Sequence, residues 1–167
     1  MVRIGIIVIS ICLMGCFGSR TEYGRKRTFN LERPKGDVNE IIYTLVDTTK
    51  LYKIVSGISI ADGKPLVSLN KTYLKFYKDA IVGTFYSFDL NDINSLNPKK
   101  AEMGYYWYDK EGLQIKTFFE HPQGGGWVKE NKIECTGDTL CFTSNGILTK
   151  YKAIDLPKKF LVFTPDW

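Results

Sequence analysis

The chain has 167 residues and a formal net charge of +5; 44% of the residues are hydrophobic and 25% are charged. This composition is typical of one globular domain and excludes a mainly disordered chain, which would be poor in aromatic and β-branched residues. It also excludes a polytopic membrane protein, because only one stretch of the sequence is continuously apolar.

That apolar stretch is the N-terminus. Residues 1–16 contain one charge, Arg3, then about a dozen mostly apolar residues, too few to span a bilayer as a helix and typical of a cleaved signal. The stretch ends in Leu13-Met14-Gly15-Cys16, which resembles the lipobox of bacterial lipoproteins. The resemblance implies that residues 1–15 are a signal peptide cut before Cys16, and that lipid is attached to this cysteine.

Two or three acyl chains make a stable anchor, whereas a single chain binds a membrane only marginally. We therefore expect membrane lipid to be a partner through Cys16. The next residue is Phe17. By the same resemblance, the absence of an aspartate at this position implies the outer membrane of the cell envelope, in an organism that has one.

Residues 16–40 are expected to form a flexible tether between the lipidated cysteine and the fold. They lack apolar periodicity and contain Gly24, Pro34 and the basic run Arg25-Lys26-Arg27. The basic run could attract anionic lipid head groups, or it could be a solvated linker.

The first element of the folded part is ambiguous. The sequence from Asp37 to Glu40 fits a helix-capping box, with Ile41, Ile42 and Leu45 at helical spacing. The isoleucine, tyrosine, threonine and valine side chains between 41 and 46 favour a strand instead, and we favour the strand.

From there to the C-terminus, strand patterns alternate with short turn signals, so neighbouring strands are expected to be antiparallel. The further candidate strands are Leu51–Ile58, Thr72–Lys78, Ala80–Phe88, Met103–Asp109, Leu113–Glu120, Trp127–Cys135, Leu140–Asn145, Ile147–Ile154 and Phe160–Thr164. The sequence therefore predicts a single all-β domain over residues 41–167. Its architecture is an antiparallel up-and-down meander of 8–9 strands, a barrel or a strongly curved sandwich.

Alternation along the strands predicts which residues face the core. Leu113 and Ile115 share one face of their strand, and in the next strand Trp127 and Ile133 oppose Glu130. We expect the apolar residues to point inward and Glu130 to point to solvent.

The evenly spaced meander is similar to the calycin group, which includes lipocalins and lipocalin-like bacterial lipoproteins. The similarity extends over about residues 43–164. It implies a β-barrel that binds a small amphipathic molecule.

Residues for familiar enzyme chemistry are scarce. The only histidine is His121, at the start of the glycine-rich loop 122–126, where an exposed hairpin residue is expected. A Ser-His-Asp site and most zinc sites need a histidine. We therefore predict no catalytic residues, no metal and no cofactor, although a pair of carboxylates from distant strands stays open.

Cys135 and Cys141 are the two thiols that remain after processing. An exported protein makes a disulfide plausible, but strand alternation places these two side chains on opposite faces. A bridge would need a bulge or a five-residue loop, so both states stay open.

Aromatic residues are the one candidate binding feature. Tyr105, Tyr106, Trp107 and Tyr108 put aromatic rings on both faces of one strand, and Trp127 lies on a nearby strand. Exposed rings would form an interaction patch. The alternative, which we favour, is that these rings pack across strands.

The sequence thus predicts a membrane-anchored envelope lipoprotein that acts as a binding module for a small amphipathic ligand or a surface partner, and not as an enzyme. The alternatives are a scaffold or accessory subunit of an envelope assembly, bound to another envelope protein, and a hydrolase inhibitor. Residues 41–167 carry nearly balanced charges and no basic stripe, so no nucleic-acid partner is expected.

Overall fold

The computed structural model describes residues 19–28, 40–66, 71–135 and 138–167. The predicted signal peptide and Cys16 lie outside the described residues.

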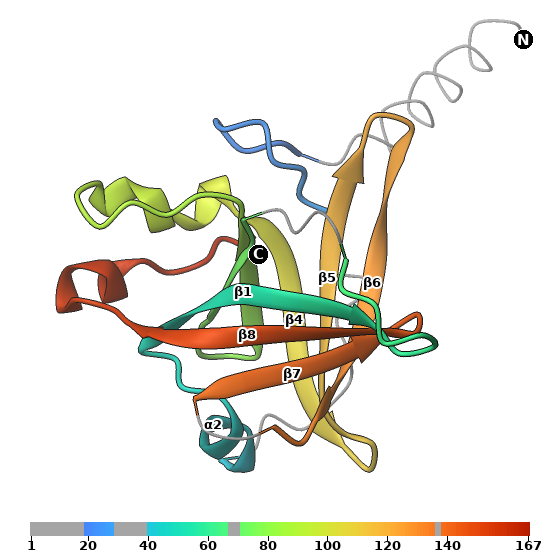
Figure 1. Ribbon diagram of the computed structural model, residues 1–167. Coiled ribbons are helices and arrows are strands. Elements are labelled where there is room, and N and C mark those ends of the chain that lie inside the picture. The colour runs from blue at the N-terminus through green and yellow to red at the C-terminus, as the bar shows by residue number, and fades with distance from the viewer. Residues whose placement is uncertain (1–18, 29–39, 67–70, 136–137) are drawn as a thin grey trace, which may run out of the picture.

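Eight antiparallel strands follow one another around a closed barrel, and β1 pairs with both β2 and β8 (Figure 1). The strands are β1 Lys50–Ser59, β2 Tyr73–Phe76, β3 Ile81–Phe85, β4 Glu102–Asp109, β5 Gly112–His121, β6 Gly124–Ile133, β7 Thr139–Ser144 and β8 Ile147–Asp155. Within the described residues, the helical elements are α2 Ile41–Leu45 and three short 3₁₀ helices, η1 Ile93–Leu96, η2 Pro98–Lys100 and η3 Lys158–Val162. The predicted all-β meander is confirmed in its closed, barrel form.

The last candidate strand, Phe160–Thr164, is wrong, because this part of the chain forms η3 and an irregular segment. A turn closes when the Phe160 amide donates to the Pro157 carbonyl at 2.9 Å. Phe160 is then buried against Leu51 and Phe85 on the outer face of the barrel. Its apolar character reflects this packing and not strand pairing.

The preferred strand at 41–46 is also wrong, because α2 occupies this position. Ile42 and Val46 are buried among the residues inside the barrel, so the short helix covers one open end (Figure 1). The burial of two large side chains outweighs the weak strand preference of the segment. Of the suggested capping box, Asp37 lies outside the described residues, and Glu40 makes no side-chain cap.

Large side chains fill the barrel interior next to α2. Phe76 makes edge-to-face contacts with Tyr52 and Tyr106, with ring centroids 5.4 and 5.1 Å apart. The buried cluster consists of Ile42, Val46, Tyr52, Leu74, Phe76, Val82, Tyr106, Leu113, Ile115, Leu140, Phe142 and Tyr151. The expected inward positions of Leu113 and Ile115 are thus confirmed.

Strand β6 has the opposite orientation to the one expected. Glu130 pairs with the buried Ile115 and therefore faces the interior, because paired residues share a face. Trp127 pairs with Phe118 and packs on the outer face. The sequence was misleading here because the outer face of β4–β6 is itself apolar and covered. Burial raises the pKa of Glu130 to about 7.

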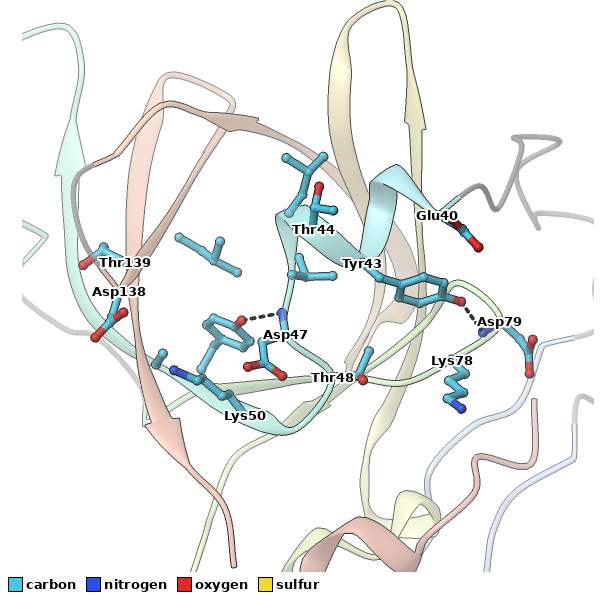
Figure 2. A pocket seen from close by; sticks show the side chains of 15 residues that line it. Glu40, Tyr43, Thr44, Asp47, Thr48, Lys50, Lys78, Asp79, Asp138 and Thr139 are labelled. Atoms are coloured by element: carbon cyan, nitrogen blue, oxygen red, sulfur yellow. Dashed lines mark hydrogen bonds between the residues drawn. The ribbon is translucent and has the colours of Figure 1, made fainter. Parts of the chain in front are cut away.

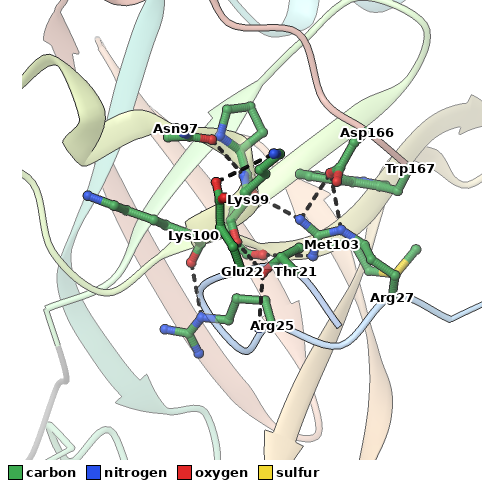
Figure 3. Close-up of polar contacts among 12 residues, drawn as sticks. Thr21, Glu22, Arg25, Arg27, Asn97, Lys99, Lys100, Met103, Asp166 and Trp167 are labelled. Carbon is green, nitrogen blue, oxygen red and sulfur yellow. Dashed lines mark hydrogen bonds and ion pairs between the residues drawn. The ribbon is translucent and has the colours of Figure 1, made fainter. Parts of the chain in front are cut away.

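Residues 19–28 pack against the barrel, so the prediction of a flexible tether is wrong for this part of 16–40 (Figure 3). The Thr21 hydroxyl donates to the Lys99 carbonyl at 2.7 Å, and Arg25 Nε donates to the Lys100 carbonyl at 3.0 Å. The segment is thereby fixed to η2 and the start of β4. We call residues 19–28 the N-terminal strap.

Arg27 is the main contact of the strap, with 8% of its surface exposed. Its guanidinium donates to the carbonyls of Ala101 at 3.1 Å and Pro98 at 3.0 Å, and it binds Asp166 Oδ1 at 3.1 Å. It also lies 4.5 Å from the ring centroid of Trp167. One side chain thus joins the N-terminal strap, η2 and the C-terminal residues.

Replacing Arg27 by Met is expected to lower the free energy of unfolding by about 2–3 kcal/mol, because two carbonyls lose a charged donor. The matched control is Arg20→Met, which removes an exposed arginine from a 2.5 Å ion pair with Glu120 on the same strap. This control should cost less than about 1 kcal/mol. Denaturant unfolding measures the free energy of unfolding of both variants. If Arg27→Met and Arg20→Met lose the same amount of stability, the contacts of Arg27 do not stabilise the fold in the way we expect.

Replacing Glu130 by Gln is expected to change how stability depends on pH. The pKa of Glu130 in the folded chain, about 7, is higher than its ordinary value of 4.5, so the folded state binds the proton more tightly. Protonation of Glu130 therefore contributes its full stabilisation of the folded state below about pH 4.5. This contribution is lost as the pH rises to about 7. Glu130→Gln should therefore be more stable than the natural chain at pH 8, by up to about 3 kcal/mol.

The control for this experiment is Glu134→Gln, at an exposed position just after β6. Thermal unfolding from pH 4 to pH 8 gives the comparison. If the natural chain and Glu130→Gln lose stability in parallel over this range, Glu130 is not the group responsible.

Candidate functional site

The four-residue aromatic run on β4 is divided between two packed layers. Tyr106 points into the barrel, where its hydroxyl donates to the Tyr77 carbonyl at 2.5 Å. Tyr105 is buried on the outer face, while Trp107 and Tyr108 are half-buried. As a correction to the suggested interaction patch, Tyr105 and Tyr106 offer no exposed surface to a partner.

Trp127 belongs to the outer layer too. Its ring stacks on Tyr105 with centroids 5.9 Å apart and meets Phe118 edge to face at 5.5 Å. Lys116 Nζ lies 5.4 Å from the same ring. These contacts join β4, β5 and β6 across the strands, which is the packing arrangement that we favoured from the sequence.

A disulfide joins Cys135 to Cys141, whose Cα atoms are 5.9 Å apart. Cys141 pairs with Ile133, the last residue of β6, so Cys135 lies beyond the paired part of the strand. The sequence separated the two cysteines because it placed Ile133 on the inner face of β6. In the structure Leu140 and Phe142 point inward, so Cys141 and its partner Ile133 share the outer face, and alternation from Ile133 brings Cys135 to the same side. The bridge joins β7 to the residue two positions past the end of β6.

His121 lies at the exposed end of β5, where its Nδ1 accepts a 3.3 Å hydrogen bond from the Gln123 amide. It shares an open pocket of about 590 Å³ with Glu102 and Glu120. Two carboxylates from different strands therefore line one pocket, which is the arrangement of acids that the sequence analysis left open. Each is paired with an arginine of the N-terminal strap: Glu120 with Arg20, and Glu102 with Arg25 at 3.5 Å.

Glu102 is buried and accepts a 2.6 Å hydrogen bond from the Tyr86 hydroxyl. Burial raises the pKa of Glu102, while the bond from Tyr86 and the charge of Arg25 act in the opposite direction. Both acids thus have partners that fix the strap to the barrel. The described residues bring no three His, Cys, Asp or Glu side chains together in a way that could hold a metal ion.

A larger pocket, of about 820 Å³, lies at the end of the barrel beside α2 (Figure 2). We call it the helix pocket. Its lining comes from α2 and the residues that follow it, from the start of β1, the β2–β3 turn and the start of β7, and from the end of β8. Its apolar part is formed by Leu45, Val46, Tyr52, Leu140 and Ala153.

Hydrogen bonds fix the segment that follows α2. The Tyr52 hydroxyl accepts from the Asp47 amide at 2.8 Å, and burial raises the pKa of this phenol. On the other side of the pocket, the Tyr43 hydroxyl accepts from the Asp79 amide at 3.3 Å (Figure 2). The two tyrosines thus hold α2 to β1 and to the β2–β3 turn.

The rim of the helix pocket is predominantly acidic. Four carboxylates line it against two lysines: Glu40, Asp47, Asp79 and Asp138 against Lys50 and Lys78. Lys50 is itself 3.6 Å from Asp155. Hydrogen bonds from Thr49 lower the pKa of Asp47, which is therefore charged at neutral pH. In a chain with positive net charge, this pocket is a local negative region.

None of the residues lining the helix pocket was identified from the sequence. They come from positions 40–52, 78–79, 138–140 and 153, which only the barrel brings together. The one available signal was the helical spacing of Ile41, Ile42 and Leu45. A helix there would have needed an apolar surface to cover, such as the end of the predicted barrel.

No family model, no curated protein and no solved structure matches this chain. Among the residues that the structure describes, no helix is both long enough and apolar enough to cross a membrane.

Proposed function

We propose that this chain is a lipid-anchored binding module of a bacterial cell envelope. Its ligand is a small amphipathic molecule with a positively charged end, and the ligand occupies the helix pocket. The observation that carries the proposal is the combination, in one pocket of about 820 Å³, of an apolar wall with a mainly acidic rim.

The volume lies within the range of about 300–1,000 Å³ that is typical of small-molecule sites. Leu45, Leu140 and Ala153 provide apolar surface for a hydrocarbon or aromatic part of the ligand. Asp47 and Asp138 provide negative charge at the opening. The site differs from a ligand chamber inside the barrel, because side chains fill the interior beside α2.

The anchoring part of the proposal rests on the lipobox-like residues Leu13-Met14-Gly15-Cys16. An anchor would keep the pocket at the envelope surface, where a soluble ligand passes by diffusion. A scaffold role in an envelope assembly is the alternative function, and in-cell crosslinking that captures one stable protein partner but no ligand would favour it.

Binding is tested with two short probes of matched chain length, hexyltrimethylammonium and hexyl sulfate, by calorimetry on the full chain. The cationic probe should bind more tightly because the rim is acidic. Asp138→Asn should weaken its binding about two- to fivefold, as expected for one exposed charge pair. The matched control is Asp62→Asn, at an exposed aspartate in the β1–β2 loop, and it should have no effect.

A second variant tests the apolar wall. Ala153→Leu extends a half-buried side chain that lines the pocket and should reduce the affinity for the cationic probe at least about tenfold, since it occupies ligand volume. Equal binding of the two probes, or an affinity that Ala153→Leu leaves unchanged, would contradict the proposed ligand.

Lipid attachment is tested by growing cells with a palmitate analogue and comparing the natural chain with Cys16→Ala. We expect label in the natural chain only, because Cys16 supplies the acylated thiol. Cys12→Ala, which removes the other N-terminal cysteine, is the control and should keep the label. Equal labelling of the natural chain and Cys16→Ala would overturn the anchor without affecting the ligand experiment.

A further inference from the structure

A second pocket, of about 440 Å³, adjoins the helix pocket on the outer side of the barrel. It lies between the β2–β3 turn and the C-terminal residues that follow η3. The two pockets share Thr48, Lys78 and Asp79. We call the second one the lysine pocket, because Lys75 forms part of its wall.

Lys75 is buried in this wall, with 3% of its surface exposed. It is a β2 residue paired with Leu51 and Gly83, and it points away from the barrel interior. Its ammonium group donates to the carbonyl oxygens of Thr48 and, at 3.0 Å, of Phe76.

None of the ion pairs within 4.0 Å among the described residues includes Lys75. The charge of Asp47 acts on it from a longer distance and works to raise the pKa of this lysine, and the ring centroid of Tyr77 lies 5.1 Å from the ammonium nitrogen. The two carbonyl bonds use two of its three protons. A buried charge whose direct hydrogen-bond partners are both neutral is costly, and an anion in contact with it would offset part of that cost.

The rest of the lysine pocket defines the kind of anion. Ile81, Phe160, Leu161, Phe163 and Pro165 give it mainly apolar walls. The charged side chains in the lining are two lysines and one aspartate, so the lining has the opposite sign to the helix pocket. Its volume is near the lower end of the range for small-molecule sites.

We propose that the lysine pocket binds a small apolar carboxylate, whose carboxylate group pairs with the Lys75 ammonium and whose hydrocarbon part contacts Phe160 and Phe163. The lysine pocket adjoins the proposed site for a cationic ligand, but the carboxylate is held by Lys75, which does not line the helix pocket, so each proposal can fail without the other.

Binding of a carboxylate should depend on pH through Lys75. Burial lowers the pKa of this lysine to about 8, so the free protein loses the charge as the pH rises through that value. A bound carboxylate favours the charged form and should raise the pKa of Lys75 by about one unit or more. Affinity should therefore be constant below about pH 7 and should fall above pH 8.

The experiment uses the full chain with ¹³C-labelled lysine side chains, titrated with benzoate and with its neutral analogue benzamide. Benzoate should shift the Lys75 signal saturably and raise the pH at which this lysine titrates, whereas benzamide should bind at least about tenfold more weakly. An unchanged Lys75 titration at high benzoate concentration, or equal binding of benzamide, would overturn the proposal.

Two variants give an independent measurement by calorimetry. Lys75→Met should reduce benzoate affinity at least about tenfold, and Lys78→Met, at an exposed lysine of the same pocket, should reduce it less than about threefold. The reverse order would contradict the assignment to Lys75. If Lys75→Met does not fold, the titration of Lys75 in the natural chain decides the question.

Discussion

Hydrogen bonds between β1 and β8 close the sheet on itself, and this closure determines where every other part of the molecule lies. In an eight-stranded barrel, the inward residues are enough to fill the interior. Beside α2 they do so, with Phe76 and Tyr106 at the centre. The candidate binding sites are therefore at the barrel end and on its outer side, where the helices and the C-terminal segment meet the strands.

The strands were predictable because each short alternating segment is bounded by residues that favour turns, as at Gly112 and Gly146. The direction in which a strand faces was less predictable. On β6, Glu130 points inward and Trp127 outward, because the outer face of this barrel has apolar layers of its own. Alternation identifies two faces but does not say which of them encloses the core.

The residues of the candidate sites could not be predicted from the sequence, because their burial also depends on which segments cover each face of the barrel. Lys75 occupies a strand position that alternation alone would assign to solvent, but the structure buries it in a wall that it shares with Tyr77 and Phe160. Arg27 is buried as well, although the composition of residues 16–40 predicted a flexible tether there. Both cations are held by backbone carbonyls of distant segments, and such partners leave no residue pattern in the sequence.

The position of the N-terminal strap has a consequence for orientation. It lies at the end of the barrel opposite α2 (Figure 1), and its first described residue, Ser19, is three positions after Cys16. Three extended residues span at most about 11 Å. If Cys16 carries lipid, the barrel would sit close to the bilayer with the α2 end turned away from it. Cargo would then enter the helix pocket from the aqueous compartment and not from the lipid phase.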